Sequence, residues 1–439
     1  MTSPGGPHGS RLDPWLESYA ERTVGMTTSE IRALFAVASR PEVVSLAGGM
    51  PCLSALPMDT VADTVAHMLR TQGQYALQYG SGQGDPTLRE QILEVMAQEG
   101  ISASAEDVVV TTGSQQALDL VTRIFINPGD VVLAESPTYV GALGVFAAYQ
   151  AQVAHVSSDD NGLIPPALEE RIRGLSSDGK RIKFLYTVTN FHNPAGTTMS
   201  LARRPQIVEI CHRYGILVLE DNPYGLLGFD REPYDALRTL SDDGVVYLGS
   251  FSKTFAPGLR VGWALAPPAV REKLVLASEA AILCPSAYAQ MTVSTYLASA
   301  DWMAQIKVYR ELYRERRDAM IDSLETLLPE ATWTHPDGGF YVWVTLPDGV
   351  DAKAMLPRAV TERVAYVPGT AFFADGTGQR HVRLSYCFPE ADRIREGVRR
   401  FAVVVHSELE LLETFGPYHA TDRSSGPSPG VQFPAPDLT

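Results

Sequence analysis

The chain has 439 residues, 45% hydrophobic and 20% charged, proportions that are typical of a globular protein. Its 51 acidic and 36 basic residues give a net charge of −15, which argues against nucleic acid as a main partner. The four cysteines lie far apart with no C-x-x-C pair, so we expect free thiols and no metal site. Because we find neither a signal-peptide pattern nor a membrane-length apolar stretch, we expect a cytoplasmic protein.

The first predicted element is an amphipathic helix over 27–40, and an alternation of strands and helices follows from about residue 107. Apolar runs predict strands at 107–112, 130–135, 180–188, 216–220 and 245–249. Helices are predicted between them at 114–126, with Ser114 as the cap, and at 139–150 and 201–215. Strands this apolar must be covered on both faces, which indicates an α/β fold with a mostly parallel sheet wrapped by helices.

After about residue 300 the pattern changes to a long charged helix at 309–328, strands at 338–346 and 380–386, a helix at 352–362 and a final helix. This pattern predicts a second, smaller α+β domain. We therefore divide the chain into a flexible N-terminal arm (1–28), a segment packing with the small domain (29–60), a large domain (61–299), the small domain (300–416) and a disordered tail (417–439).

Polar residues cluster directly after five of the predicted strands. The stretches are "TTGSQQ", "ESPTY", "TNFHNPAG", "EDNPY" and "SFSK". Parallel strands bring such loops to one edge of the sheet, where α/β proteins bind ligands. One loop of this kind would mean little, but five predict a site.

Lys253 stands in the last of these loops, in "GSFSKTFAPGLR". A lysine that is desolvated beside hydroxyl groups and another cation has a lowered pKa, which makes its amine nucleophilic toward carbonyl groups. Arg260 is the predicted cation, and Ser250 and Ser252 together with Arg260 form a candidate phosphate cradle. The helix that begins at Ser114 offers free backbone N–H groups to the same anion.

Asp221 ends the apolar run "ILVLE", so its carboxylate is expected to be buried at the sheet edge. A buried carboxylate needs a partner, and a protonated ring nitrogen is a suitable one. The alternative is a turn-forming aspartate before Pro223. Asn193 in "NPAG" is likewise a plausible turn residue, and Tyr139 a plausible core residue. Lysine, phosphate cradle and acid together indicate pyridoxal 5'-phosphate as the cofactor.

The motifs "SFSKTFAPGLRVGW", "NPAG", "EDNPY", "TTGSQQALDL" and "HVRLSY" resemble those of class I/II aminotransferases of fold type I, which use pyridoxal phosphate. The resemblance covers about 29 to 415. The "SEIRALF…VVSLAGGMP" and "LQYGSGQGDPTLRE" patterns are similar to a subgroup that contains 2-aminoadipate aminotransferases and the effector-like domains of certain bacterial regulators. The resemblance implies an aspartate-aminotransferase-like fold and a homodimer with shared active sites.

The resemblance also implies a role for each matching residue. Lys253 would bind the cofactor through its amine and move the Cα proton, and Asp221 would pair with the ring nitrogen. Tyr224 and Asn193 would hydrogen-bond the ring hydroxyl, and Tyr139 would stack on the ring. The remaining roles are phosphate binding by Ser114, Gln115, Ser250, Ser252 and Arg260, with Tyr79 from the partner subunit, and binding of the substrate α-carboxylate by Arg383 near Gly49.

Two residues depart from the subgroup's pattern: His192, where glutamine is frequent, and Asn222, where aspartate is common. We expect both to affect the substrate side rather than the cofactor, and we expect His192 to act behind the site rather than as a base.

Three other readings fit worse. The S-x-x-K pattern of serine β-lactamases lacks its companion S-D-N and K-T-G motifs. The "GSGQG" stretch follows a polar segment rather than a strand, which disfavours a dinucleotide loop. A transcriptional regulator needs a DNA-binding segment ahead of residue 29, for which we expect no room.

The predicted function is transfer of an amino group from an L-amino acid to a 2-oxo acid such as 2-oxoglutarate by a ping-pong mechanism. The expected donors are 2-aminoadipate or glutamate, branched-chain and aromatic amino acids. Arg32 in the 27–40 helix is either a solvated arginine or the partner of a distal substrate carboxylate. A decarboxylation, elimination or oxidation at Cα with the same cofactor remains the alternative.

Overall fold

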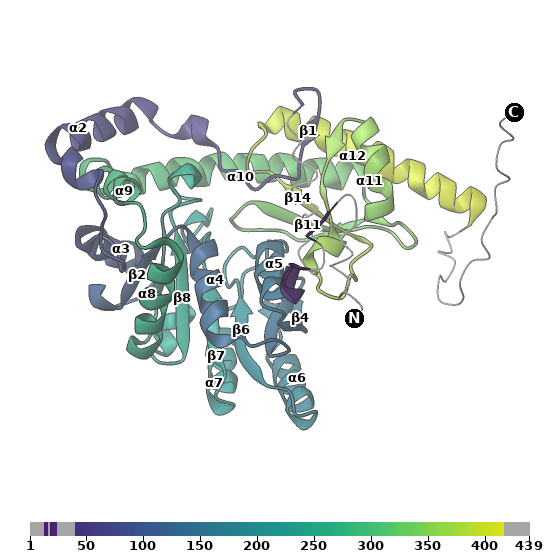
Figure 1. Ribbon diagram of the computed structural model, residues 1–439. Helices are drawn as coiled ribbons and strands as arrows, with labels where there is room; N and C mark the ends of the chain where they lie inside the picture. Colours follow the sequence, from purple (N-terminus) through teal and green to yellow (C-terminus); the bar gives the residue numbers. More distant parts are fainter. Residues whose placement is uncertain (1–12, 16–17, 24–39, 417–439) are drawn as a thin grey trace, which may run out of the picture.

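The structure is a computed structural model that describes residues 13–15, 18–23 and 40–416 (Figure 1). Arg32, nearly all of the predicted 27–40 helix, most of the predicted N-terminal arm and the predicted tail over 417–439 lie outside the described residues. Within the described ranges, no helix has both the length and the apolar composition needed to cross a membrane.

The larger sheet has eight strands in the order β2-β9-β8-β7-β6-β3-β4-β5. Its central strands β3, β4, β6, β7 and β8 run parallel, whereas β9 runs antiparallel to both β2 and β8. The bounds are β2 Val108–Thr111, β3 Val131–Ser136, β4 Gln152–Asp159, β5 Gly162–Leu163, β6 Ile182–Thr187, β7 Leu217–Asp221, β8 Val245–Ser250 and β9 Gly262–Leu265. The predicted α/β architecture with a mostly parallel sheet is confirmed.

Helices cover both faces of this sheet, as the apolar strands require. Neighbouring residues of β8 illustrate the two faces, because Val246 packs in the core under α4 and α5 while Val245 packs in the core under α6 and α7. The bounds are α2 Met58–Ala76, α3 Pro86–Ala97, α4 Ser114–Phe125, α5 Val140–Ala148, α6 Pro165–Ser177, α7 Arg203–Arg213, α8 Pro268–Ile282 and α9 Ala287–Ser299. One predicted cap is wrong: Ser114 is the first helical residue of α4, and Gly113, with φ of 80°, is the cap.

A second sheet, of the order β10-β11-β14-β13, is antiparallel and packs with the C-terminal helices. Its strands are β10 Thr332–Trp333, β11 Tyr341–Thr345, β13 Val367–Pro368 and β14 His381–Ser385, and its helices are α10 Trp302–Leu327, α11 Ala352–Thr361 and α12 Ala391–Phe415. The short strand β1 (Val44–Ser45) pairs with β12 (Val364–Ala365) beside this sheet. The chain before α2 therefore contacts the C-terminal part directly.

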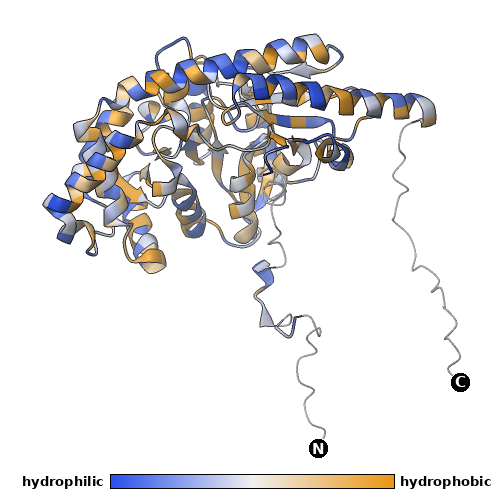
Figure 2. Cartoon of the chain, turned by 90° about the horizontal axis from the view of Figure 1, so that it is seen from above, coloured by the Kyte–Doolittle hydropathy of each residue, from blue (hydrophilic) through white to orange (hydrophobic). Residues whose placement is uncertain are grey.

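The long helix α10 connects the two parts, since it runs from beside α9 to beside α12 (Figure 1). After Val405, α12 has no buried residue and extends past the body of the molecule (Figure 2). Single-turn 3-10 helices lie at Glu21–Thr23, Leu53–Ala55, Ala105–Asp107, Gly225–Leu227, Leu237–Leu240, Pro257–Leu259 and Gly369–Phe372.

Candidate active site

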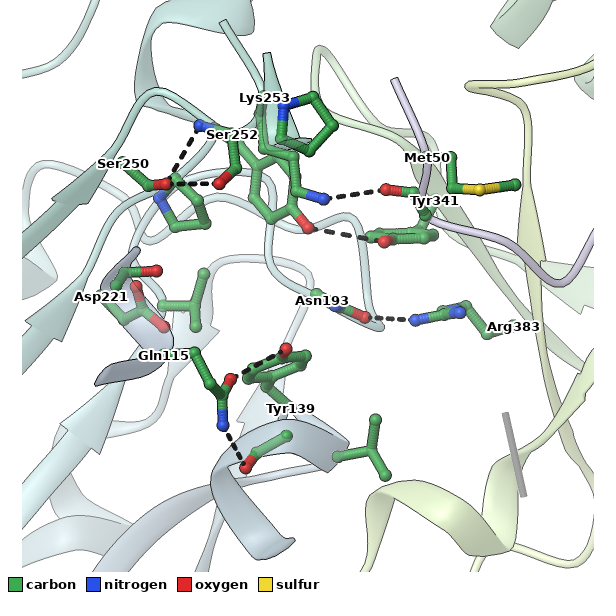
Figure 3. A pocket seen from close by; sticks show the side chains of 18 of the residues that line it. Met50, Gln115, Tyr139, Asn193, Asp221, Ser250, Ser252, Lys253, Tyr341 and Arg383 are labelled. Carbon is green, nitrogen blue, oxygen red and sulfur yellow. Dashed lines mark hydrogen bonds between the residues drawn. The ribbon is translucent and has the colours of Figure 1, made fainter. Parts of the chain in front are cut away.

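A cavity of about 390 Å³ lies where the parallel strands of the large sheet end, facing the second sheet (Figure 3). The predicted site residues that line it are Gly49, Ser114, Gln115, Tyr139, Asn193, Asp221, Tyr224, Ser250, Ser252, Lys253, Arg260 and Arg383. Tyr79 is not among them: its side chain is 76% exposed and lies over a separate surface hollow. Arg32 lies outside the described residues.

Lys253 follows the end of β8 and directs its amine into the cavity (Figure 3). Its Nζ donates a hydrogen bond of 2.8 Å to the Gly49 carbonyl oxygen. The pKa of Lys253 is lowered to about 8, mainly by burial; the Cys387 thiol opposes this shift, and the charges of Arg383 and Arg260 add to it. The sequence predicted desolvation and Arg260 together as the causes; desolvation is the larger, and Arg383 also contributes. A lysine with this pKa has a substantial neutral, nucleophilic fraction near neutral pH.

Asp221 ends β7 and is only 5% exposed. Its Oδ2 accepts a hydrogen bond of 2.8 Å from the Tyr186 hydroxyl, while its buried Oδ1 has no partner among the described residues. Burial raises the pKa of Asp221 to about 6. A protonated pyridine nitrogen would supply the missing donor and the missing positive charge, so this carboxyl group fits the cofactor's ring. Among the described residues no backbone N–H donates to this carboxyl group, as an aspartate turn before Pro223 would require.

An anion cradle forms where α4 begins beside the β8–β9 loop. The Ser250 hydroxyl donates to the Ser252 hydroxyl over 2.8 Å, and Arg260 Nη1 donates to the same Ser252 oxygen over 3.3 Å. A Cβ added to Gly113 would collide with the Arg260 guanidinium, so the cation lies against the start of α4. Hydroxyl groups, a guanidinium and the free N–H groups of a helix start are the donors that a phosphate requires.

Tyr139 and Gln115 form one wall of the cavity. The Tyr139 hydroxyl donates to Gln115 Oε1 over 3.2 Å, and Gln115 Nε2 donates to the Gly141 carbonyl over 3.1 Å. Burial raises the pKa of Tyr139 to about 12, so its hydroxyl stays protonated. The Gln115 side-chain amide thus fixes the Tyr139 ring at the cavity wall (Figure 3).

Arg383 on β14 is 2% exposed and lines the opposite end of the cavity. Its Nη1 donates to Asn193 Oδ1 over 2.8 Å and its Nη2 donates to the Ala47 carbonyl over 2.6 Å. The buried Nε has no partner among the described residues. The guanidinium also lies 4.2 Å from the centre of the Tyr341 ring. A substrate carboxylate would satisfy this buried cation.

Sequence reasoning missed Tyr341, Met50 and Tyr186. Tyr341 lines the cavity, and its hydroxyl lies 3.5 Å from that of Tyr224 (Figure 3). Met50 follows Gly49 at the same wall. For Tyr186 a signal existed, because a tyrosine inside an apolar strand must find a hydrogen-bond partner.

His192 and Asn222, the two departures from the subgroup, are both buried, and neither lines the cavity. His192 Nε2 lies 3.1 Å from Glu135 Oε2, and its Nδ1 accepts from the Ala195 backbone N–H over 3.3 Å. Asn222 Nδ2 donates to Glu99 Oε1 over 2.6 Å. Each of the two residues thus contacts a buried glutamate. Each is also the sequence neighbour of a residue that lines the cavity, Asn193 or Asp221.

Comparison with known proteins agrees with this geometry. The model of the family "Aminotransferase class I and II" matches residues 41–401. The chain is 40% identical over 395 residues to aromatic-amino-acid aminotransferase 1 of Thermococcus litoralis, which covers 89% of this chain and 95% of that protein.

Two solved structures share the fold. Kynurenine aminotransferase of Pyrococcus horikoshii, crystallised with PMP, superposes with a TM-score of 0.87 at 38% identity over 91% of this chain and 100% of that one. LysN, the α-aminoadipate aminotransferase of Thermus thermophilus in complex with N-(5'-phosphopyridoxyl)-L-leucine, has a TM-score of 0.84 at 36% identity over 90% of this chain and 99% of that one. The chain therefore belongs to the class I and II aminotransferase family, with the aspartate-aminotransferase-like fold, and is an aminotransferase that depends on pyridoxal phosphate.

Proposed function

We propose that this aminotransferase acts in a ping-pong cycle on L-amino acids with apolar, aromatic or acidic side chains and uses a 2-oxo acid such as 2-oxoglutarate as acceptor. The observation that carries the proposal is one cavity that joins a lysine of lowered pKa, a buried carboxyl group with an unpartnered oxygen and a buried arginine. When bound, pyridoxal phosphate supplies a ring that withdraws electrons from the substrate's Cα.

In this proposal the large sheet binds the cofactor. Lys253 holds it through its amine, and Asp221 holds the proton on the ring nitrogen. Tyr224 and Asn193 donate to the ring hydroxyl, and Tyr139 covers the ring face. The phosphate is bound by Ser114, Gln115, Ser250, Ser252 and Arg260, which is supported by their convergence at the start of α4.

The substrate is oriented from the second sheet. Arg383 would bind the α-carboxylate near Gly49, across the cavity from Lys253. Once the substrate's amino group has freed it from the cofactor, the amine of Lys253 would hold and move the Cα proton. Its lowered pKa suits this task, since a base is most effective when its pKa lies close to the working pH.

The side chain of the donor meets a largely apolar wall. Met50, Val140 and Tyr341 line the cavity, and the cations among its described lining residues are Lys253, Arg260 and Arg383, which already have roles. This supports donors with aromatic or branched apolar side chains. For a donor with a distal carboxylate, Arg32 remains the candidate partner. Relatives that act on aromatic amino acids, kynurenine and α-aminoadipate support the same breadth.

The test is a panel of amino donors, with 2-oxoglutarate as acceptor, assayed on the wild type and on Arg32→Ala. We expect Arg32→Ala to reduce kcat/KM for glutamate and 2-aminoadipate at least tenfold more than for phenylalanine or leucine, because only acidic donors lose an ion pair (about 1.4 kcal/mol). Arg395→Ala, an exposed change on α12, is the control. Equal losses across the panel would remove Arg32 from the specificity. Loss of the donor amino group without appearance of the acceptor's amino acid would refute transamination.

We further propose a homodimer in which Tyr79 reaches the phosphate of the partner subunit. The support is a group of exposed apolar side chains around Tyr79, namely Tyr75, Leu77, Ile282 and Leu283, which a second copy would cover.

We also propose a reducing compartment such as the cytoplasm, which is supported by the four unpaired cysteines.

A further inference from the structure

A buried carboxylate lies directly behind the active site. Glu99 follows the end of α3 and is 2% exposed. Its Oε1 accepts a hydrogen bond of 2.6 Å from Asn222 Nδ2, and its Oε2 accepts one of 2.5 Å from the Tyr247 hydroxyl. The mechanism proposed above uses none of these three side chains.

The two donors belong to segments that carry active-site residues. Asn222 lies next to Asp221 at the end of β7, and Tyr247 lies on β8, the strand that ends at Ser250. Glu99 therefore joins the end of β7 to the middle of the neighbouring strand β8 from behind the sheet.

The chain around Asn222 is fitted to this carboxylate. A Cβ added to Gly225 would overlap Glu99 Oε1, so any larger residue there would have to displace the carboxylate from its place beside Asn222. The 222–225 turn thus wraps the carboxylate, while Asp221 before it and Tyr224 within it face the cavity.

Other polar groups complete the surroundings of Glu99. The Asn222 amide oxygen accepts from Asn190 Nδ2 over 3.1 Å, and Arg204 Nη2 donates to Asn190 Oδ1 over 2.6 Å. Arg204 on α7 and Glu220 on β7 are the charged groups that act on Glu99, with opposite signs. The Glu220 carboxylate is itself bound by two backbone N–H groups and by the Thr189 hydroxyl.

We propose that Glu99 is a positioning residue of the active site, whose carboxylate anchors the 221–225 segment to the middle of β8 and thereby fixes Asp221 and Tyr224 against the cofactor. The proposal rests on the roles given to those two residues above. Hydrogen bonds to an ionised carboxylate are roughly twice as strong as those between neutral groups, so the anchor is firmest when Glu99 is charged.

The protonation of Glu99 falls in an accessible pH range. Burial raises the pKa of Glu99 from 4.5 to about 7, opposed by the hydrogen bonds from Tyr247 and Asn222. Because the folded chain resists ionisation of Glu99, the free energy of unfolding falls as the pH rises from 4.5 to about 7. Above about pH 7 this decrease has reached its full size. Below pH 7 the carboxyl group carries a proton, and one of its two acceptor contacts must become a donor contact.

The test compares Glu99→Gln, a neutral mimic of the protonated form, with Glu94→Gln, an exposed change on the preceding helix α3. The first measurement is amide hydrogen exchange of the 221–229 peptide in the cofactor-free protein. The second is the dissociation constant of pyridoxal phosphate between pH 6 and 8.5. We expect Glu99→Gln to exchange this peptide roughly tenfold faster and to bind the cofactor roughly tenfold more weakly at pH 8, as for the loss of one charge-assisted hydrogen bond.

The pH profile distinguishes positioning from a purely structural role. Cofactor binding by the wild type should tighten as the pH rises through about 7, the pKa of Glu99, and Glu99→Gln should lack this step. A lower melting temperature with unchanged exchange and an unchanged step would overturn the proposal. So would faster exchange without any change in cofactor binding.

If Glu99→Gln fails to fold, Tyr247→Phe removes a single donor and leaves Asn222 in place. We then expect faster exchange and weaker cofactor binding than in the wild type, but with smaller changes than for Glu99→Gln. Unchanged values would refute the proposed anchoring by Glu99. Since hydrogen exchange is measured without cofactor, a failure of the anchor is distinguishable from a failure of the proposed role of Asp221, which Asp221→Asn tests.

Discussion

Asn193 and Arg383 join the two sheets by a side-chain hydrogen bond, in which Arg383 Nη1 donates to Asn193 Oδ1 over 2.8 Å. Asn193 follows β6 of the large sheet, and Arg383 lies on β14 of the second sheet. One bond thus connects a residue proposed to bind the cofactor with the residue proposed to bind the substrate. A substrate carboxylate that engages Arg383 is thereby positioned relative to the cofactor ring.

Arg383→Lys should impair the use of substrate far more than the binding of cofactor. A lysine ammonium cannot contact Asn193, the Ala47 carbonyl and a carboxylate in the geometry of a planar guanidinium. We expect kcat/KM to fall by roughly 100-fold, or about 2.7 kcal/mol, with the visible absorption of the bound cofactor nearly unchanged. Arg380→Lys, a half-exposed position directly before β14, is the control. A loss confined to cofactor affinity would contradict the assignment.

Lys253→Ala should abolish turnover and covalent attachment, while the phosphate cradle still retains the cofactor noncovalently. Borohydride reduction of the wild type, followed by peptide mapping, should place the adduct on Lys253. The exposed Lys273→Ala change on α8 should leave both results unaltered. An adduct on another lysine would overturn the site as a whole.

The attachment rate should also depend on pH. Because the pKa of Lys253 is lowered to about 8, the neutral amine becomes abundant as the pH rises through that value. The rate at which cofactor-free protein gains its visible absorption should level off above about pH 8, rather than continue to rise toward the ordinary lysine value of about 10.4.

Asp221→Asn should slow catalysis and stabilise the cofactor-free protein. The neutral amide cannot hold a proton on the ring nitrogen, and loss of such an electrostatic group typically costs about 10²–10³ in kcat. Since the pKa of Asp221 is raised from 3.8 to about 6, its ionisation makes the folded chain less stable as the pH rises through that range.

The stabilising effect of the same variant has a definite size and pH dependence. Removing the buried charge should add at most about 3 kcal/mol to the free energy of unfolding above pH 6, and little at pH 4. Thermal unfolding of wild-type and variant cofactor-free protein at both pH values measures this. A variant with normal kcat would mean that Asp221 has no role at the ring.

Tyr79 should act across a subunit interface. Mixing Lys253→Ala chains with Tyr79→Phe chains gives heterodimers in which one site is intact and the other carries both changes. We expect the activity of these heterodimers to exceed the average of the two homodimers. In the control, Leu276→Ala, an exposed change on α8, replaces Tyr79→Phe, and the heterodimers should show only the average activity. Activity equal to that average, with heterodimers proven to be present, would refute sharing.

The sequence was sufficient to predict which residues of the large sheet line the cavity, because parallel strands end at a common edge. Asp221 ends β7 and Lys253 follows β8, and the apolar runs made both strands recognisable. The residue types then indicated the chemistry. The cap of α4 was misassigned because a serine outranks glycine in propensity, whereas the left-handed Gly113 is set by the close approach of Arg260.

The other side of the cavity depends on contacts between distant segments. Tyr341 was expected on a strand, but neither its face nor the position of its sheet follows from local sequence. The local sequence does not single out Glu99, and only the fold shows it buried under Asn222. The domain boundaries drawn from the sequence and the role of Arg32 stay predictions.

Strand β9 returns antiparallel along β8, so the loop that carries Lys253 and Arg260 begins and ends on neighbouring strands. Both cations are therefore carried by one segment between two strands of the large sheet. In the course of evolution this segment would be inherited as one piece, because an insertion between Lys253 and Arg260 would change the spacing of the amine and the proposed phosphate anchor. Met50 and Tyr341 lie outside it, on separate segments that are free to vary. Proteins with this arrangement can change their substrate specificity while they retain the segment that is proposed to bind the cofactor.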